Sequence, residues 1–78
     1  MNKATLQTWV RSALSSDPQT PEQIANYIQK QCSHETGISV GKVTIILNQL
    51  ENAGLCYTTL HRNPTSGDRT IFYFISKN

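Results

Sequence analysis

Apolar residues recur at helical spacing in three separate stretches of the chain. In the first stretch, residues 4–15, they fall at positions i, i+3, i+4, i+7 and i+8 and form one broad apolar face: Leu6, Trp9, Val10, Ala13 and Leu14. The segment S-S-D-P at residues 15–18 ends this stretch, because a residue before proline is driven out of the helical conformation. The pattern predicts an amphipathic helix over residues 4–15.

The second stretch opens with the strongest helix-start signal in the sequence. The segment T-P-E-Q at residues 20–23 places a threonine at the N-cap, a proline at the first helical position and a glutamine where it completes a capping box. Ile24, Ala25 and Ile28 then mark the buried side of the helix. We expect this helix to end near Cys32.

The third stretch, residues 39–55, holds a helix together with its start and stop signals. Its apolar stripe consists of Val43, Ile46, Leu47, Leu50 and Ala53. Ser39 is suited to the N-cap, since its hydroxyl can accept from backbone N–H groups of the first turn. Gly54 suits the left-handed residue that ends a helix, and Leu55 can fold back on the last turn as in a Schellman cap. We expect Leu47 and Leu50 to be fully buried where the three helices meet.

After residue 55 the pattern becomes typical of strands. Residues 56–62 and 70–76 are rich in β-branched and aromatic residues, and the turn-forming cluster N-P-T-S-G-D lies between them. An antiparallel hairpin is therefore predicted. In its second strand, alternation places Ile71, Tyr73 and Ile75 on one face and Phe72 and Phe74 on the other. We expect one of these faces to pack on the helices and the other to form a surplus apolar surface, covered by the N-terminal helix or by a second subunit.

Length and composition narrow the class of protein. A chain of 78 residues can form only a small core, burying somewhat over ~60% of its unfolded surface, so a single domain over residues 1–78 is expected. No apolar run approaches the ~20 residues of a membrane span, and the chain does not open with a signal-peptide core. Cys32 and Cys56 fit reduced thiols better than a disulfide scaffold. We expect a cytoplasmic protein without a membrane partner.

The net charge of +2 is small but unevenly placed. Residues 1–38 carry three basic and three acidic side chains, whereas residues 39–78 carry four basic and two acidic ones. All the excess positive charge therefore lies in the half with the third helix and the hairpin. This is a weak electrostatic indication of a polyanionic partner.

The succession of three helices, a terminal Gly-Leu and a hairpin with a polar tip resembles the winged helix-turn-helix DNA-binding superfamily. The resemblance covers Leu6 to Ile75 and is most specific in the pattern V-x3-L-x2-L-x3-G-L over residues 43–55. It implies an α+β fold with three helices followed by a two-stranded antiparallel wing hairpin. Between Ala25 and Ser39 the chain has several more residues than compact members of the superfamily, so residues 30–38 must form the end of a longer second helix followed by a loop.

The resemblance also implies that the third helix enters the major groove of DNA while the hairpin follows the flanking backbone. It places six residues on the outer face of that helix: Val40, Gly41, Lys42, Thr44, Ile45 and Asn48. Lys42 can neutralise phosphate or read guanine, Thr44 can bond to bases or phosphates, and Asn48 can pair with adenine. Gly41 permits a close approach at the start of the helix, where backbone N–H groups favour a phosphate.

In the hairpin, the resemblance implies that His61, Arg62 and Arg69 flank the DNA-contacting loop. Arg62 and Arg69 are the stronger phosphate candidates, because they are charged at any cellular pH. The predicted DNA-binding set is therefore Gly41, Lys42, Thr44, Ile45, Asn48, Arg62 and Arg69. Ile45 departs from the polar or basic residue usual in relatives, and it fits either a thymine methyl group or a protein interface.

Two functions stay open on these grounds. The first is sequence-specific binding of double-stranded DNA by a small transcriptional regulator of bacterial, phage or plasmid type, acting as a dimer at least on DNA. The second is a winged-helix adaptor that binds a protein partner through Ile45 and the outer face of its hairpin, without binding DNA. Salt-dependent binding lost on mutating Lys42 favours the first, and salt-insensitive association through Ile45 favours the second.

Two patterns typical of catalytic and metal sites lack the context that such sites require. The segment G-I-S-V-G at residues 37–41 matches a nucleophile elbow, but that motif needs a large parallel sheet that so short a chain cannot supply. Cys32, His34, Cys56 and His61 are potential zinc ligands, but their spacings match no common structural site. We therefore expect a protein that is not an enzyme and that has no metal, cofactor or small-molecule ligand.

Overall fold

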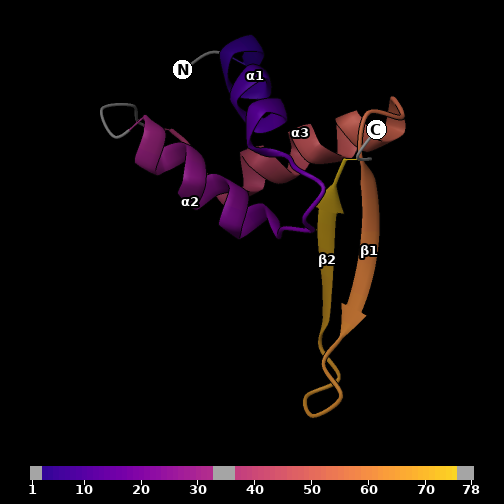
Figure 1. The fold of residues 1–78 in the computed structure, drawn as a ribbon. Coiled ribbons are helices and arrows are strands. Elements are labelled where there is room, and N and C mark those ends of the chain that lie inside the picture. Colours follow the sequence, from indigo (N-terminus) through magenta and orange to yellow (C-terminus); the bar gives the residue numbers. More distant parts are fainter. Residues whose placement is uncertain (1–2, 33–36, 76–78) are drawn as a thin grey trace.

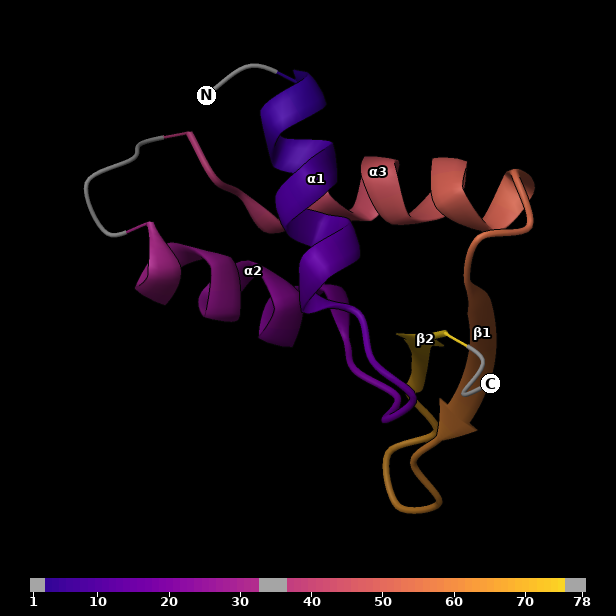
Figure 2. The same cartoon turned by 45° about the horizontal axis from the view of Figure 1, so that its top comes forward.

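The computed structural model describes residues 3–32 and 37–75, which form three helices followed by a two-stranded hairpin (Figure 1). In chain order the elements are α1 (Lys3–Ala13), α2 (Pro21–Gln31), α3 (Val40–Asn52), β1 (Tyr57–Arg62) and β2 (Arg69–Phe74). This is the predicted α+β arrangement, with the element order of a winged helix-turn-helix. The helices form one group, and the hairpin extends away from it so that its tip lies far from the helices (Figure 1, Figure 2).

The core lies where the three helices meet. All three helices contribute apolar positions that the helical spacing predicted: Leu6, Val10, Leu14, Ile24, Ala25, Ile28, Val43, Ile46, Leu47 and Leu50. Leu47 and Leu50 are 0% and 1% exposed, which confirms their predicted burial. Cys56 and Tyr73 add the base of the hairpin to the same cluster. Among the described residues, the buried positions of the hairpin therefore lie at its base, where it packs on the helices.

The predicted start of α2 is confirmed in full. Thr20 Oγ1 accepts a hydrogen bond from the Gln23 backbone N–H at 3.1 Å, and Gln23 Oε1 accepts from the Thr20 backbone N–H at 2.9 Å. These two bonds form a capping box, with Pro21 at the first helical position, where its missing N–H leaves no bond unmade. The helix ends with Cys32 as its C-cap, also as predicted.

The start and stop signals of α3 are likewise confirmed. Ser39 Oγ accepts from the Lys42 backbone N–H at 3.2 Å. At the other end, Gly54 has a positive φ of 77°, and the Leu55 N–H donates to the Leu50 carbonyl at 2.9 Å. Gly54 N–H also donates to the carbonyl of Glu51. This pair of bonds is a Schellman cap, which turns the chain into β1.

Helix α1 ends two residues earlier than the predicted residue 15. The Ser15 carbonyl accepts from the Ile75 N–H at 2.9 Å, so this residue bonds to the hairpin and does not continue the helix. Gln19 Nε2 donates to the carbonyl of Ala13 at 3.2 Å and thereby satisfies the last helical turn. Both partners lie outside the helix, and for that reason the local apolar pattern did not reveal the true end.

The two strands pair in antiparallel register, from Tyr57 opposite Phe74 to Arg62 opposite Arg69. Strand β1 begins one residue later than predicted, and β2 begins one residue earlier. Strand β2 ends at residue 74, after which the chain bonds to the α1–α2 link. Ser76, the predicted end of this strand, lies outside the described residues.

Tyr73 joins the hairpin to the helices through both its backbone and its side chain. Its N–H donates to the Gln19 carbonyl at 2.7 Å, and its carbonyl accepts from the Gln19 N–H at 3.0 Å, which adds the α1–α2 link to β2 as an isolated bridge. The Tyr73 side chain is 3% exposed, and its hydroxyl donates to Asn48 Oδ1 on α3 at 2.8 Å. Strand β2 is thus held from two directions.

The predicted alternation along β2 holds, but burial changes along the strand. Tyr73 is buried and Ile75 packs against the core, whereas Ile71 on the same face is 47% exposed. Leu60, opposite Ile71 in the register, is 58% exposed. The inner face therefore becomes solvent-exposed where the hairpin extends beyond the helices.

Phe72 and Phe74 lie on the strand face opposite to Tyr73, and each is partly buried. The Phe74 ring lies 5.7 Å from the ring of Tyr57, centroid to centroid, and the Phe72 ring lies 6.3 Å from that of His61 in an edge-on contact. Cross-strand ring pairs on the outer face thus cover much of this surface within the hairpin itself. These ring pairs were not among the covers predicted for the surplus face, and its cover by a second subunit stays a prediction.

We expect Leu47→Ala and Leu50→Ala each to lower the free energy of unfolding by about 2–5 kcal/mol, because each leaves a cavity at the centre of the core. Urea denaturation at neutral pH measures the loss. Ile45→Ala is the matched control, since Ile45 lies on the same helix but is 58% exposed, and its effect should stay within about 0.5 kcal/mol. Losses below about 1 kcal/mol for both leucine variants would contradict this account of the core.

Candidate nucleic-acid interface

The surface of α3 that faces away from the core carries three residues of the predicted DNA-binding set. Because a helix turns about 100° per residue, positions 43, 46, 47 and 50 share the buried side, and positions 41, 45 and 48 lie on the opposite side. Gly41, Ile45 and Asn48 are all exposed. A Cβ built on Gly41 meets no atom within 4 Å, so this part of the helix surface is open.

Lys42 and Thr44 lie on opposite flanks of this exposed stripe, about 160° apart around the helix axis. Thr44 is partly buried, and its hydroxyl donates to the Val40 carbonyl at 2.7 Å. Lys42 is exposed on the other flank, with its ammonium group beside Gly37. The polar residues predicted on one outer face are therefore divided, with Asn48 nearer to Thr44 than to Lys42.

A groove of about 390 Å³ runs between the starts of α2 and α3 and strand β2. It is lined by Thr20, Pro21, Glu22, Val40, Thr44, Arg69, Thr70, Ile71 and Tyr73. It brings Thr44 and Val40 of the predicted helix surface together with Arg69 of the predicted hairpin surface. Glu22 supplies one negative charge against the positive charge of Arg69, so the groove is close to electrically neutral.

Arg62 and Arg69 stand directly opposite each other in the last pair of the strand ladder. Both are exposed. Residues that stand opposite each other in an antiparallel ladder lie on the same face of the sheet, and the face alternates from one pair to the next. Arg69 is four residues before Tyr73, so both arginines lie on the same face as Tyr73. Two like charges in this position repel each other, and an anion bound between them would remove that repulsion. His61 lies on the other face, edge-on to the ring of Phe72.

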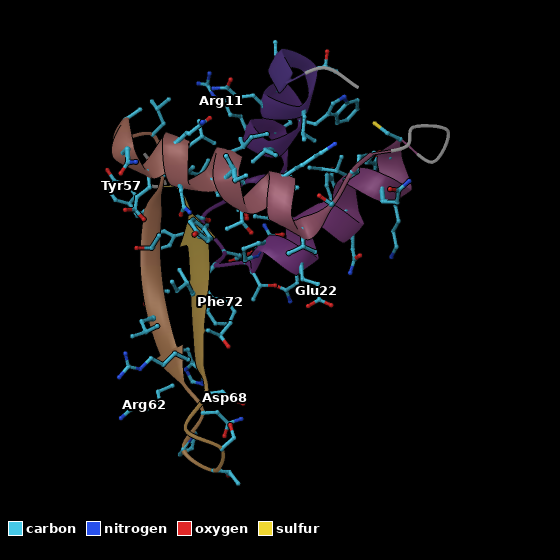
Figure 3. The ribbon with its side chains drawn as sticks, turned by 180° about the vertical axis from the view of Figure 1, so that it is seen from behind. Arg11, Glu22, Tyr57, Arg62, Asp68 and Phe72 are labelled. Atoms are coloured by element: carbon cyan, nitrogen blue, oxygen red, sulfur yellow. The ribbon has the colours of Figure 1, made fainter. Side chains whose placement is uncertain are left out.

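The loop beyond the arginines is closed by its own hydrogen bonds. Asn63 Oδ1 accepts from the N–H groups of Thr65 at 2.8 Å and Ser66 at 3.3 Å, and the Asn63 N–H donates to the Asp68 carbonyl at 2.8 Å. Gly67 has a positive φ of 78°, which suits glycine in a tight turn. Arg62 and Asp68 both lie at this end of the hairpin (Figure 3). The tip is therefore an ordered turn that carries a net positive charge.

Asn48 is exposed, but one of its side-chain atoms already has a partner inside the protein. Its Oδ1 accepts from the Tyr73 hydroxyl at 2.8 Å. Alternation along β2 correctly grouped Tyr73 with Ile71 and Ile75 on one face, but it gave no signal that the phenol reaches Asn48, which lies 25 residues away. Tyr73 thus supports this surface from below by bonding to Asn48, a role that the sequence pattern did not predict.

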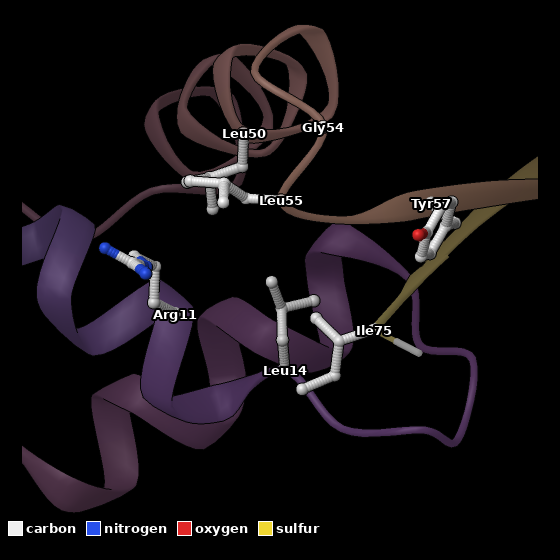
Figure 4. Close-up of a pocket in the computed structure, with 7 residues that line it drawn as sticks. All are labelled: Arg11, Leu14, Leu50, Gly54, Leu55, Tyr57 and Ile75. Atoms are coloured by element: carbon white, nitrogen blue, oxygen red, sulfur yellow. The ribbon is translucent and has the colours of Figure 1, made fainter. Parts of the chain in front are cut away.

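A second cavity, of about 310 Å³, lies between α1, the end of α3 and the base of the hairpin. Its lining residues are Arg11, Leu14, Leu50, Gly54, Leu55, Tyr57 and Ile75. Arg11 lies at one end and Tyr57 at the other, with apolar side chains between them (Figure 4). This cavity contains none of the residues predicted to bind DNA.

Three of the candidate catalytic and metal-binding residues, Ser39, Cys32 and Cys56, serve to cap a helix or to fill the protein interior. Ser39 of the G-x-S-x-G segment caps α3. Cys32 and Cys56 are free and buried, and Cys56 Sγ donates to the Leu47 carbonyl at 3.6 Å. Among residues 3–32 and 37–75, no three His, Cys, Asp or Glu side chains form a group able to hold a metal ion, and His34 lies outside these ranges.

Comparison with known proteins adds no family assignment. The chain matches no protein-family model and no curated protein. Within the described residues, none of the helices has the length and apolar character needed to cross a membrane.

Two buried acids near the end of α3 resist ionisation. Burial raises the pKa of the Cys56 thiol above its ordinary value of 9.0, and the negative charge of Glu51 raises it further. Burial likewise raises the pKa of the Tyr73 phenol above 10.0, with smaller contributions from Glu51 and Cys56. Both groups therefore hold their protons more tightly in the folded protein than in the unfolded chain.

We expect the free energy of unfolding to fall as the pH rises through about 9, because the unfolded chain then releases the Cys56 proton while the folded protein retains it. Below the ordinary pKa both states are protonated and this contribution to stability is complete. Urea midpoints at pH 7 and about pH 9.5 measure the decline, which should be smaller in Cys56→Ala. Equal declines in the two proteins would show that Cys56 does not contribute.

Proposed function

We propose that the protein binds double-stranded DNA in a sequence-specific manner and acts as a small transcriptional regulator. In this proposal α3 enters the major groove and the hairpin lies along the flanking backbone. The observation that carries it is the placement of Arg62 and Arg69, which stand opposite each other on the hairpin face that also packs toward α3. One of these arginines, Arg69, lines the same groove as Val40 and Thr44 of α3.

The division of side chains around α3 suits a helix enclosed by the two walls of a groove. Gly41, Ile45 and Asn48 point away from the core, where base edges would lie. Lys42 and Thr44, on opposite flanks, would then face the phosphates of opposite strands. Gly41 allows the backbone to approach the DNA closely, and Ile45 offers an apolar contact to a thymine methyl group.

The hairpin supplies the contacts that do not depend on base sequence. Each arginine that neutralises a phosphate releases a counterion, which makes binding depend on salt concentration. The bonds that close the loop from Asn63 to Asp68 order the tip before DNA arrives, so little conformational entropy is lost there on binding. The positive charge of one subunit is modest. We therefore propose that two copies bind together and read two half-sites.

A second candidate function is supported by exposed apolar side chains. Ile45 and Leu60 are each 58% exposed, and Val40 and Ile71 are also exposed. Two of these, Val40 and Ile71, line the groove beside α3. An adaptor that binds a protein partner would bury such residues at the centre of its interface. In this alternative Ile45 binds the partner together with Leu60 and Ile71, which lie on the same hairpin face as Tyr73 and not on the outer face expected from the sequence.

The test of DNA binding is selection of bound duplexes from random DNA, followed by titrations at several salt concentrations. Asn48→Ala should weaken binding by about 1–3 kcal/mol, mainly on the selected sequence. Arg69→Ala should weaken binding to all duplexes and make the salt dependence shallower by about one unit. Arg11→Ala is the matched control, because it removes the same charge from α1, at the end of the molecule opposite to Arg62 (Figure 3).

The adaptor function predicts a different set of results for the same variants. Asn48→Ala and Arg69→Ala would leave association unchanged, whereas Ile45→Asp would abolish binding to a protein partner in a manner insensitive to salt. Sedimentation of the free protein and of its DNA complex counts the subunits in each. If the protein binds no duplex in the selection or the titrations, the regulator function is excluded and the adaptor function remains.

A further inference from the structure

The hydrogen bond between Tyr73 and Asn48 connects the buried face of the hairpin to the exposed face of α3. Its donor, the Tyr73 hydroxyl, belongs to a side chain that is 3% exposed, and its acceptor, Asn48 Oδ1, belongs to an exposed residue. The 2.8 Å distance is typical of a well-formed O–H···O bond. The bond therefore fixes an exposed amide by means of a buried phenol.

The direction of this bond decides which chemical groups Asn48 presents to its surroundings. A tyrosine phenol is protonated at neutral pH, and that of Tyr73 acts here as the donor. Asn48 uses Oδ1 to accept that proton. Its Nδ2 group, with two N–H donors, is at the other side of the planar amide and carries the donors available to a ligand.

We propose that Tyr73 is a positioning residue that makes Asn48 select guanine over adenine at the base it contacts. This inference rests on the proposed DNA-binding function and goes beyond it by naming the base. Guanine presents two acceptors, N7 and O6, in the major groove, which suit a group that offers donors. Adenine presents one acceptor and one donor, and its usual bidentate pairing with asparagine requires a freely directed Oδ1.

Tyr73→Phe tests this assignment, because it removes the hydroxyl and keeps the ring that fills the core. Released from the phenol, Asn48 can turn its Oδ1 toward DNA and pair with adenine. Selection from random DNA should yield guanine at the Asn48-dependent position with the wild-type protein. With Tyr73→Phe the preference for guanine over adenine should fall by roughly tenfold or reverse. The Asn48-dependent position is the one at which Asn48→Ala loses base preference.

Tyr57→Phe is the matched control. Tyr57 lies on the neighbouring strand with its ring against Phe74, on the face opposite to Tyr73. Removing its hydroxyl leaves the bond to Asn48 intact, so the selected base should not change. Thermal unfolding of both variants separates a change in base preference from a general loss of structure.

Asn48→Asp provides a second test that leaves Tyr73 unchanged. The carboxylate still accepts from the phenol, but its outward oxygen is an acceptor where the amide offered donors. Its preferred base should therefore change from guanine to cytosine, whose N4 group is a donor. This result keeps the inference testable if Tyr73→Phe does not fold.

The side-chain amide signals of Asn48 in NMR spectra of the free protein test the bond without DNA. They should shift in Tyr73→Phe and remain in place in Tyr57→Phe. Selection of adenine by the wild-type protein, or the same base preference in wild type and Tyr73→Phe, would overturn the inference while leaving DNA binding itself established. Failure of the wild-type protein to bind any duplex would overturn both, and the NMR signals would then show whether the bond alone exists.

Discussion

The position of the hairpin relative to the helices depends on the attachment of Tyr73. A two-stranded hairpin is marginally stable by itself in water, so it needs apolar burial against another element. Tyr73 provides this burial in the common core and also bonds to Gln19 through its backbone and to Asn48 through its hydroxyl. Because these contacts involve the α1–α2 link and α3 together, they hold the hairpin against two separate parts of the helical group.

The features that the sequence predicted well are those determined by neighbouring residues. The capping box of α2 and the Schellman cap after α3 involve residues within a few positions of each other, and the apolar spacing of α3 determines its buried side directly. The ends of α1 and β2 were displaced because the Ser15 carbonyl bonds to Ile75, 60 positions along the chain. A contact between residues so far apart in the sequence cannot be predicted from the local pattern of either segment.

The candidate site shows the same division between local and long-range information. Exposure of Gly41, Ile45 and Asn48 follows from helical periodicity, and the separation of Lys42 from Thr44 follows from the same geometry once each residue is placed around the axis. The partner of Asn48 does not follow from periodicity, because it depends on the register of β2 and on how the hairpin packs. Without that partner, asparagine on an exposed helix face is best suited to adenine, with which it forms its usual bidentate pair.

The hairpin is packed on the helices at its base, and its tip projects from them, so a small rotation at the base moves the tip much farther. Six residues of strand span about 20 Å. A rotation of about 10° at the base would therefore move the tip by about 3.5 Å, which is more than the donor–acceptor distance of a hydrogen bond. Arg62 and Arg69 lie near the moving end, and the core packing of Tyr73 lies near the fixed end. A small repacking around one buried ring would therefore change the spacing between the paired charges and α3 by more than it changes the core itself.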